Sequence, residues 1–278
     1  MKQNYTRRTA NLKARKKAHR AKKIRNFRTT SEINKRLFSR DAMRLAADSV
    51  KGFLEGTIVY IDLLSNHLPK TLNNKPYHLP EWRHISEQAK GCFYQLAGAD
   101  IEAQSDLIAA PFTFNLSVTL WKAAAEDKSP DVTYLQHRIK TTLKRALKRA
   151  PDFWFAYELN HSPNNTGKPH LHGTILLKPT EYKKARDAFH QMNGNVSPDF
   201  KRHAIVFSSG KRQRQTKELG GIYTNLKWAL YCTKERGFTR YFYLPRQNTV
   251  TASRLLAQAA KQYYQQTRQH QSNVISHR

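Results

Sequence analysis

The chain of 278 residues is 39% hydrophobic and 11% aromatic, which suits one sizeable domain with extensions or two modest domains and excludes a wholly disordered protein. Its formal net charge of +29 indicates a polyanionic partner, with nucleic acid as the first candidate. Having only two cysteines excludes a disulfide framework and a cysteine-type zinc site, and the lack of an apolar run near ~18 residues argues against membrane binding.

Positive charge dominates the first part of the chain, where residues 1–40 hold fifteen lysines and arginines and one acidic residue, Glu32. Because no apolar periodicity accompanies this charge, we expect residues 1–30 to form a disordered or conditionally helical basic arm that attracts phosphate without sequence specificity. The arm lacks the apolar stretch of a secretory signal, so we expect a cytoplasmic protein. Residues 31–108 have helical periodicity interrupted by a loop with several prolines and asparagines, and are interpreted as a helical accessory segment whose second helix spans about 80–98.

At Pro111 the sequence changes to a β pattern. Residues 112–120 alternate and predict a strand. Residues 132–150 predict an amphipathic helix, whose basic face is interpreted as a solvated surface rather than a phosphate-binding one. Two further strands are predicted at 153–159 and 169–177, and the polar loop between them allows a hairpin.

The remaining predicted elements alternate between helices and strands. They are a helix at 181–192, a strand at 203–207, a helix from 222 to about 236 ended by Gly237, a strand at 238–244, and a glutamine-rich tail, 247–278, that is helical only at its start. A basic loop at 208–217 contains Lys211, Arg212 and Arg214, which are candidates for DNA contact. The whole order predicts an α+β fold with a central antiparallel sheet flanked by helices.

The predicted hairpin carries a candidate metal site. Side chains alternate between the two faces of a strand, so His170 and His172 point the same way while Leu171 points into the core. If the strands pair, Glu158 can come level with the histidines. Two imidazoles and a carboxylate on one face make a divalent-metal site with open positions for substrate. A His-x-His pair alone is more often found as surface histidines on a half-buried strand.

The helix that begins at residue 222 carries a candidate nucleophile. At about 100° per residue, its apolar stripe is formed by Ile222, Leu226, Ala229, Leu230 and Thr233. Tyr231 lies nearly opposite the centre of that stripe, where a core tyrosine would not be. Lys234 is one turn further on and can approach the same groups as Tyr231. Taken alone, a surface tyrosine beside a surface lysine explains the pattern equally well.

Together, the strand at 112–120, Glu158, Pro169-His170-Leu171-His172-Gly173 and Tyr231-Cys-Thr-Lys234-Glu235 resemble the HUH endonucleases, the replication initiators of rolling-circle DNA elements. The resemblance covers about residues 109–246 and implies a ferredoxin-like or RRM-like sheet. It is closest to the single-tyrosine initiators, because Lys227 stands one turn before Tyr231, where two-tyrosine members carry a second tyrosine. Tyr223, two turns away, is a possible second nucleophile. The chain lacks a phosphate-loop motif, so no fused helicase is expected.

The resemblance implies that the protein nicks and transfers DNA strands. Mg²⁺ or Mn²⁺ held by His170, His172 and Glu158 would polarise the scissile phosphate, and Tyr231 would attack it to form a covalent 5′-phosphotyrosine. Lys234 would offset negative charge, and Lys227 would join the basic loop in binding DNA. The expected substrate is single-stranded or hairpin origin DNA of a bacterial mobile element, with host helicase and polymerase as partners.

Three other interpretations remain open at this stage. A transposase or relaxase-like strand transferase would use the same chemistry. A mononuclear iron oxygenase also uses two histidines and a carboxylate, but gives the positive charge and the Tyr-x-x-Lys helix no role. A non-catalytic nucleic-acid-binding protein would make the metal motif coincidental.

Overall fold

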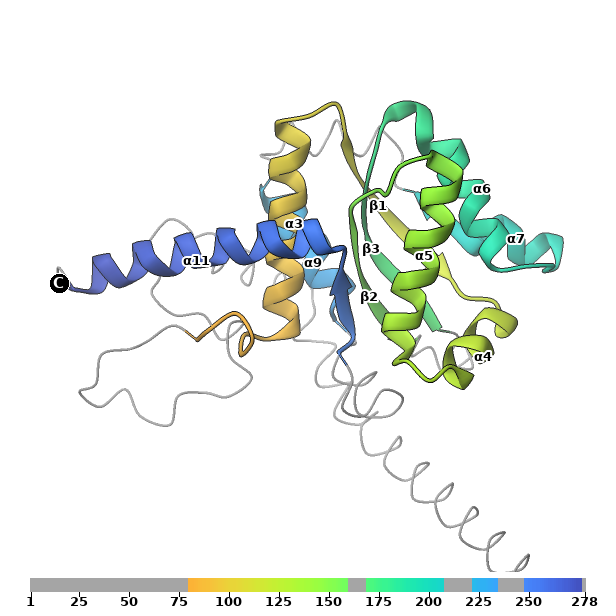
Figure 1. Ribbon diagram of the computed structural model, residues 1–278, viewed down its shortest axis with the longest axis horizontal. Coiled ribbons are helices and arrows are strands. Elements are labelled where there is room, and N and C mark those ends of the chain that lie inside the picture. Colours follow the sequence, from red (N-terminus) through yellow and green to blue (C-terminus); the bar gives the residue numbers. More distant parts are fainter. Residues whose placement is uncertain (1–79, 160–168, 208–221, 235–247, 277–278) are drawn as a thin grey trace, which may run out of the picture. The chain divides into compact units, whose positions relative to one another are not determined.

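The computed structural model describes residues 80–159, 169–207, 222–234 and 248–276, all within the compact unit Arg44–Arg278 (Figure 1). The predicted basic arm, the first part of the accessory segment, the basic loop at 208–217 and the strand at 238–244 lie outside the described residues.

A five-stranded sheet forms the centre of the described structure. Its strands are β1 (Ile108–Asn115), β2 (Phe153–Leu159), β3 (Pro169–Leu177), β4 (Ile205–Phe207) and β5 (Val250–Ala252). They are arranged in the order β4-β1-β3-β2-β5, and every neighbouring pair is antiparallel. The prediction of an α+β fold with a central antiparallel sheet is therefore confirmed, and β2 and β3 pair as the hairpin expected from their sequences.

Helices cover both faces of the sheet. The described helices are α3 (Glu87–Ala103), α4 (Val118–Glu126), α5 (Asp131–Leu147), the 3₁₀ turn η2 (Pro179–Glu181), α6 (Tyr182–Met192), α7 (Pro198–Ala204), α9 (Ile222–Cys232) and α11 (Arg254–Ser276). In Figure 1, α3 and α9 lie on one side of the sheet and α5 and α6 on the other. No helix in the described ranges is both long enough and apolar enough to span a membrane.

Alternation along the strands decides which side chains meet which helix layer. Phe114 of β1 lies in a row with Leu171 of β3, and its ring centroid is 4.8 Å from that of Phe189 on α6. On the opposite face, the Trp154 indole Nε1 of β2 donates to Gln95 Oε1 of α3 at 2.9 Å. The face toward α6 is thus aromatic and aliphatic, whereas the face toward α3 and α9 also carries polar side chains.

The helix α3 holds α9 in its place above the sheet. Gly91 of α3 makes this close approach possible, because a Cβ at that position would lie 3.2 Å from the Thr233 Cγ2. The Thr233 hydroxyl in turn donates to the carbonyl of Ala229 at 2.9 Å, which closes the last turn of α9. Part of the predicted accessory segment therefore shares its hydrophobic core with α9 and α11.

The structure corrects two of the predicted strands. The second half of the strand predicted at 112–120 is wrong. The strand β1 starts at Ile108 and ends at Asn115. The Ser117 hydroxyl then accepts a hydrogen bond from Leu120 N and caps α4. Residues 203–204 belong to α7, so β4 begins only at Ile205. Alternation alone could not separate β1 from α4, because the amphipathic pattern continues through the cap.

Two helix ends and one strand also differ from expectation. α9 ends at Cys232 rather than near 236, and α11 continues to Ser276 where fraying was expected. The three-residue strand β5 was not predicted, because Val250-Thr-Ala252 is too short to give a periodic signal. Its backbone is positioned by non-local contacts, such as Thr249 O, which accepts from Tyr157 N at 2.8 Å.

Candidate metal and tyrosine site

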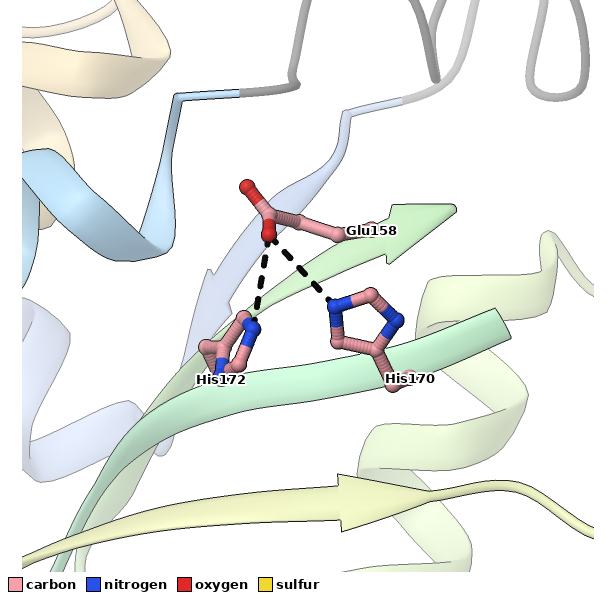
Figure 2. Close-up of side chains that lie close together, drawn as sticks. All are labelled: Glu158, His170 and His172. Atoms are coloured by element: carbon pink, nitrogen blue, oxygen red, sulfur yellow. Dashed lines mark ion pairs between the residues drawn. The ribbon is translucent and has the colours of Figure 1, made fainter. Parts of the chain in front are cut away.

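Strand register brings the acidic residue and the histidines together. Glu158 of β2 lies directly opposite His170 of β3, and His172, two residues on, lies opposite Ala156. All four side chains therefore point to the face that carries α9. Figure 2 shows the Glu158 carboxylate between the two imidazole rings. The prediction that Glu158 comes level with the histidines is confirmed.

The three side chains have the geometry of a ligand set. The Nε2 atoms of His170 and His172 lie 3.6 Å and 3.5 Å from the same oxygen, Oε2, of Glu158. One ligand atom from each residue lies within 4.8 Å of the other two, and within the described ranges no other group of this kind occurs. Imidazole nitrogens with a carboxylate oxygen are a donor set that divalent first-row metals accept. The group could therefore hold a metal ion.

Burial and charged neighbours shift the pKa values of His172 and Glu158 in the direction that suits metal binding. Burial lowers the pKa of His172 to about 3, and the Lys234 ammonium reinforces this against the opposing effect of the Glu158 carboxylate. For Glu158, burial alone would raise the carboxyl pKa, but the hydrogen bond with His170 and the Lys234 charge outweigh it, so the pKa lies below its ordinary value. A neutral imidazole and an ionised carboxylate are the forms that bind metal.

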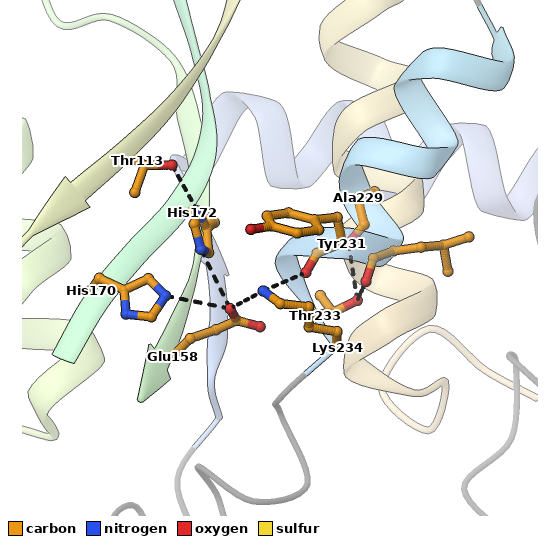
Figure 3. Close-up of polar contacts among 9 residues, drawn as sticks. Thr113, Glu158, His170, His172, Ala229, Tyr231, Thr233 and Lys234 are labelled. Atoms are coloured by element: carbon orange, nitrogen blue, oxygen red, sulfur yellow. Dashed lines mark hydrogen bonds and ion pairs between the residues drawn. The ribbon is translucent and has the colours of Figure 1, made fainter. Parts of the chain in front are cut away.

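Thr113 of β1 contacts the outer nitrogen of His172. The two residues are register partners, and Thr113 Oγ1 lies 2.9 Å from His172 Nδ1 (Figure 3). When Nε2 carries a metal, Nδ1 must carry the proton, and donation to the threonine hydroxyl fixes that tautomer and the ring orientation. Sequence analysis did not identify Thr113, because no local pattern reveals which residue of β1 lies beside His172.

The tyrosine of α9 faces the histidines. Leu226, Ala229 and Leu230 are buried, whereas Tyr231 is 38% exposed, as the helical wheel predicted. The Tyr231 ring centroid lies 5.2 Å from that of His172. Figure 3 shows its hydroxyl pointing toward the strand that carries both histidines. The phenol and the candidate metal ligands therefore occupy the same face of the sheet.

Trp228 fixes the orientation of the tyrosine ring. Its indole stacks on Tyr231 with ring centroids 5.5 Å apart and planes inclined by 17°. The indole Nε1 also donates to the carbonyl of Gly173 at 3.1 Å, which ties α9 to β3 immediately after His172. Gly173 is required here because a Cβ would lie 2.0 Å from the Trp154 carbonyl oxygen of β2. Trp228 was not singled out from the sequence, although its spacing of three residues from Tyr231 was a usable signal.

Lys234 lies between the Tyr231 ring and the Glu158 carboxylate and contacts both. Its Nζ donates to Glu158 Oε2 at 2.7 Å and lies 3.8 Å from the centroid of the Tyr231 ring. Burial alone would lower the Lys234 pKa, but the Glu158 carboxylate raises it above its ordinary value, so the ammonium is charged. The lysine thus faces the same oxygen as the two imidazoles.

The other predicted DNA-contact residues are only partly described. Lys227 is exposed on α9. Tyr223 lies in the first turn of α9, but its side chain is outside the described part of the chain, as are Lys211, Arg212 and Arg214.

Comparison of the chain with models of known protein families, with curated proteins and with solved structures finds no match. The functional interpretation therefore depends on the geometry of this site.

Proposed function

We propose that the protein is an HUH-type DNA endonuclease and strand transferase that initiates rolling-circle replication of a mobile element. The single observation that supports this most is the convergence of Tyr231, on α9, and Lys234, two residues beyond the end of α9, on the group formed by Glu158, His170 and His172. A potential nucleophile beside a potential metal site is the arrangement that phosphodiester transfer requires.

The donor set fits a divalent cation. His170, His172 and Glu158 would hold Mg²⁺ or Mn²⁺, and the imidazoles suit Mn²⁺ better. When bound, the cation supplies Lewis-acid polarisation of the non-bridging phosphate oxygens.

Tyr231 would be the nucleophile. Its Oη attacks the phosphorus in line, so that an O–P bond to the tyrosine forms as the P–O3′ bond breaks. The phenol releases its proton to solvent, and the departing 3′ oxygen takes one up to become a 3′-OH. The 5′ phosphate stays on the enzyme, and attack by a 3′-OH on this linkage rejoins strands without an external energy source.

Two neighbours would assist this step. Trp228 stacks on the phenol and limits its ring to one orientation, which favours in-line attack. The Lys234 ammonium, 3.8 Å from the ring centroid, would stabilise negative charge that develops on the phenol oxygen.

The net charge of +29 supports a DNA substrate, and an extended or hairpin single strand would give Tyr231 access to its phosphate. The free 3′-OH would prime a host polymerase after a host helicase opens the duplex. A transposase or relaxase-like transferase is the alternative within this chemistry. Replication of a plasmid that carries the DNA flanking the coding region, and loss of this replication with Tyr231→Phe, would separate the initiator from that alternative.

The direct test uses labelled single-stranded oligonucleotides from the DNA that flanks the coding region, with Mn²⁺ or Mg²⁺. The wild-type protein should give a nick and an SDS-stable protein–DNA adduct, and EDTA should prevent both. Tyr231→Phe keeps the ring that stacks on Trp228 but removes Oη, so the adduct should disappear. Tyr134→Phe, on α5 at the other face of the sheet, is the matched control and should retain full activity.

Each outcome has a defined meaning. Adduct formation by Tyr231→Phe would transfer the nucleophile's role to Tyr223, which Tyr223→Phe would test. Loss of cleavage in His170→Ala with DNA binding retained would support the metal role. Wild-type protein that binds DNA but never cleaves it with either metal would refute the enzyme and leave a binding protein.

A further inference from the structure

An open groove lies at the β4 edge of the sheet, outside the tyrosine site. It is formed by α6, α7 and β4, and its lining includes Arg186, His190, Lys201, Arg202, Val206 and Phe207. No acidic side chain is part of this lining within the described residues. The nearest ion pair, Arg202 Nη2 to Asp199 Oδ1 at 4.0 Å, joins two largely exposed side chains and neutralises little of the charge.

The electrostatics of the groove favour an anion. Arg186 and Lys201 line the same groove as His190. Burial lowers the pKa of His190, and these two positive charges lower it further against the opposing Asp187. The Nδ1 of His190 is buried and has no hydrogen-bond partner among the described residues. A phosphate group in the groove would offset this clustered positive charge.

Apolar surface accompanies the cations. Pro198 and Val206 both line the groove and are exposed, Val206 by 51%. A duplex presents phosphates and hides the faces of its bases, whereas a single strand presents both. The combination of cations and exposed apolar side chains therefore suits a single strand better than a duplex.

Strand register connects the groove with the tyrosine site. Val206 of β4 is the partner of Thr113 on β1, and Thr113 is the partner of His172 on β3. These three side chains form one row across the sheet and point to the same face. Two strand spacings of about 4.8 Å separate Val206 from His172 by about 10 Å.

The junction of α7 and β4 is also held to the end of β1. Asn115 Nδ2 donates to the carbonyl of His203 at 2.6 Å, and Asn115 is the register partner of His170. The groove and the candidate metal ligands thus both adjoin β1. Because α6 lies on the opposite side of the sheet from α9, a nucleic acid would pass around the β4 edge from one to the other (Figure 1).

We propose that this groove binds single-stranded DNA on one side of the phosphate that Tyr231 attacks. Arg186, Lys201 and Arg202 contact the backbone, and Val206 and Pro198 provide the apolar contact for bases. The identity of the reacting phosphate rests on the proposed function, whereas binding in the groove does not depend on catalysis.

Binding is tested by fluorescence anisotropy of labelled oligonucleotides in a Tyr231→Phe background, which prevents cleavage. The groove variant carries Arg186→Gln, Lys201→Gln and Arg202→Gln. The control variant carries Lys140→Gln, Lys144→Gln and Arg145→Gln on exposed positions of α5. Both remove three positive charges, so the non-specific attraction of the whole protein falls equally. Thermal unfolding should show that both variants fold.

We expect the groove variant to bind single-stranded DNA at least tenfold more weakly than the control variant. The slope of log Kd against log salt concentration should fall by about 2, because each of three phosphate contacts contributes about 0.7 for a single strand. Val206→Glu, a single change at an exposed position, should also weaken binding several-fold. Equal losses in the groove and control variants would overturn the proposal, and so would an equal groove-dependent loss for duplex DNA or RNA.

The position of the bound segment is tested with cleavable oligonucleotides in the wild-type background. Stepwise shortening of the oligonucleotide on one side of the nick should abolish the difference between groove and control variants once the remaining strand no longer reaches the groove. Binding that depends on the groove, without any nick, would refute the proposed function but support the groove as a binding site. Nicking that is the same in the groove and control variants would refute DNA binding in the groove but support the proposed function.

Discussion

Two buried glutamates, Glu158 on β2 and Glu181 in η2, have different surroundings. Glu181 accepts from Arg149 Nε at 2.8 Å, makes a second contact with the same guanidinium, and accepts from Lys178 N at 2.9 Å. Around Glu158, in contrast, one ammonium and two imidazole nitrogens converge on the single oxygen Oε2. A guanidinium that makes two contacts with one carboxylate forms a complete structural pair, whereas imidazole nitrogens around one carboxylate oxygen are groups that could bind a cation together with it.

The pKa direction does not distinguish these two residues. In both, burial alone would raise the carboxyl pKa, and polar partners outweigh it: His170 and Lys234 at Glu158, and Arg149 at Glu181. The difference lies in the chemistry of the partners. A charged carboxylate in the interior is therefore a candidate site only where its neighbours can themselves act as ligands.

The comparison is tested most strongly by neutralising each glutamate. Glu158→Gln should weaken Mn²⁺ binding by more than about 100-fold, because loss of outer partners alone costs 10–100-fold and this change removes a charged ligand. Glu181→Gln is the matched control and should leave Mn²⁺ affinity within about twofold. Isothermal titration calorimetry measures both. Similar losses of Mn²⁺ affinity in the two variants would show that Glu158 affects metal binding only by stabilising the fold.

A second prediction concerns the outer contact of His172. Thr113→Val keeps the shape of the side chain and removes the oxygen that holds Nδ1, so Mn²⁺ affinity should fall by about tenfold. Thr113→Ser should restore most of it, because the hydroxyl returns. Rescue by serine, measured in the same calorimeter, separates positioning of the imidazole from packing of β1. Unchanged affinity in Thr113→Val would remove Thr113 from the site.

Lys234 gives a prediction of opposite sign. Its ammonium competes with a metal for Glu158 Oε2, so Lys234→Met should bind Mn²⁺ about threefold to tenfold more tightly than the wild type. The same variant should nick DNA more slowly, because positive charge beside Tyr231 is lost. Weaker metal binding in Lys234→Met would mean that the lysine supports the ligand set rather than competing with it.

The smallest expected effect is a pH dependence at Glu181. Its pKa is lower in the folded protein than in the unfolded chain, so its contribution is present above the ordinary carboxyl pKa and is lost as pH falls below it. In EDTA, Glu181→Gln should be about 1–2 kcal/mol less stable than the wild type at pH 7, and this gap should shrink between pH 5 and 3. Urea unfolding at each pH measures it. A stability difference between the two proteins that stays constant down to pH 3 would contradict a lowered Glu181 pKa in the folded protein.

Much of the site was accessible from local sequence patterns. The two-residue period of a strand placed His170 and His172 on one face and Leu171 on the other, and the helical period set Tyr231 apart from Leu226 and Leu230. These patterns are reliable because backbone geometry inside one strand or helix determines them. These patterns did not show where α4 starts. The strand β1 ends just before the Ser117 cap, but the sequence stays amphipathic on both sides of Ser117.

By itself, the sequence determined which face of each element carries chemically active side chains and that the hairpin could align Glu158 with the histidines. Only the tertiary structure decided that α9 packs over β3, that Thr113 lies beside His172, that Lys234 reaches Glu158, and that Val206 continues the row of the site to the sheet edge. The physical reason is that periodicity is a property of one element, whereas register and packing depend on contacts between residues distant in the chain. Here those contacts include the fit of Gly91 against Thr233 and the hydrogen bond from Trp228 to Gly173.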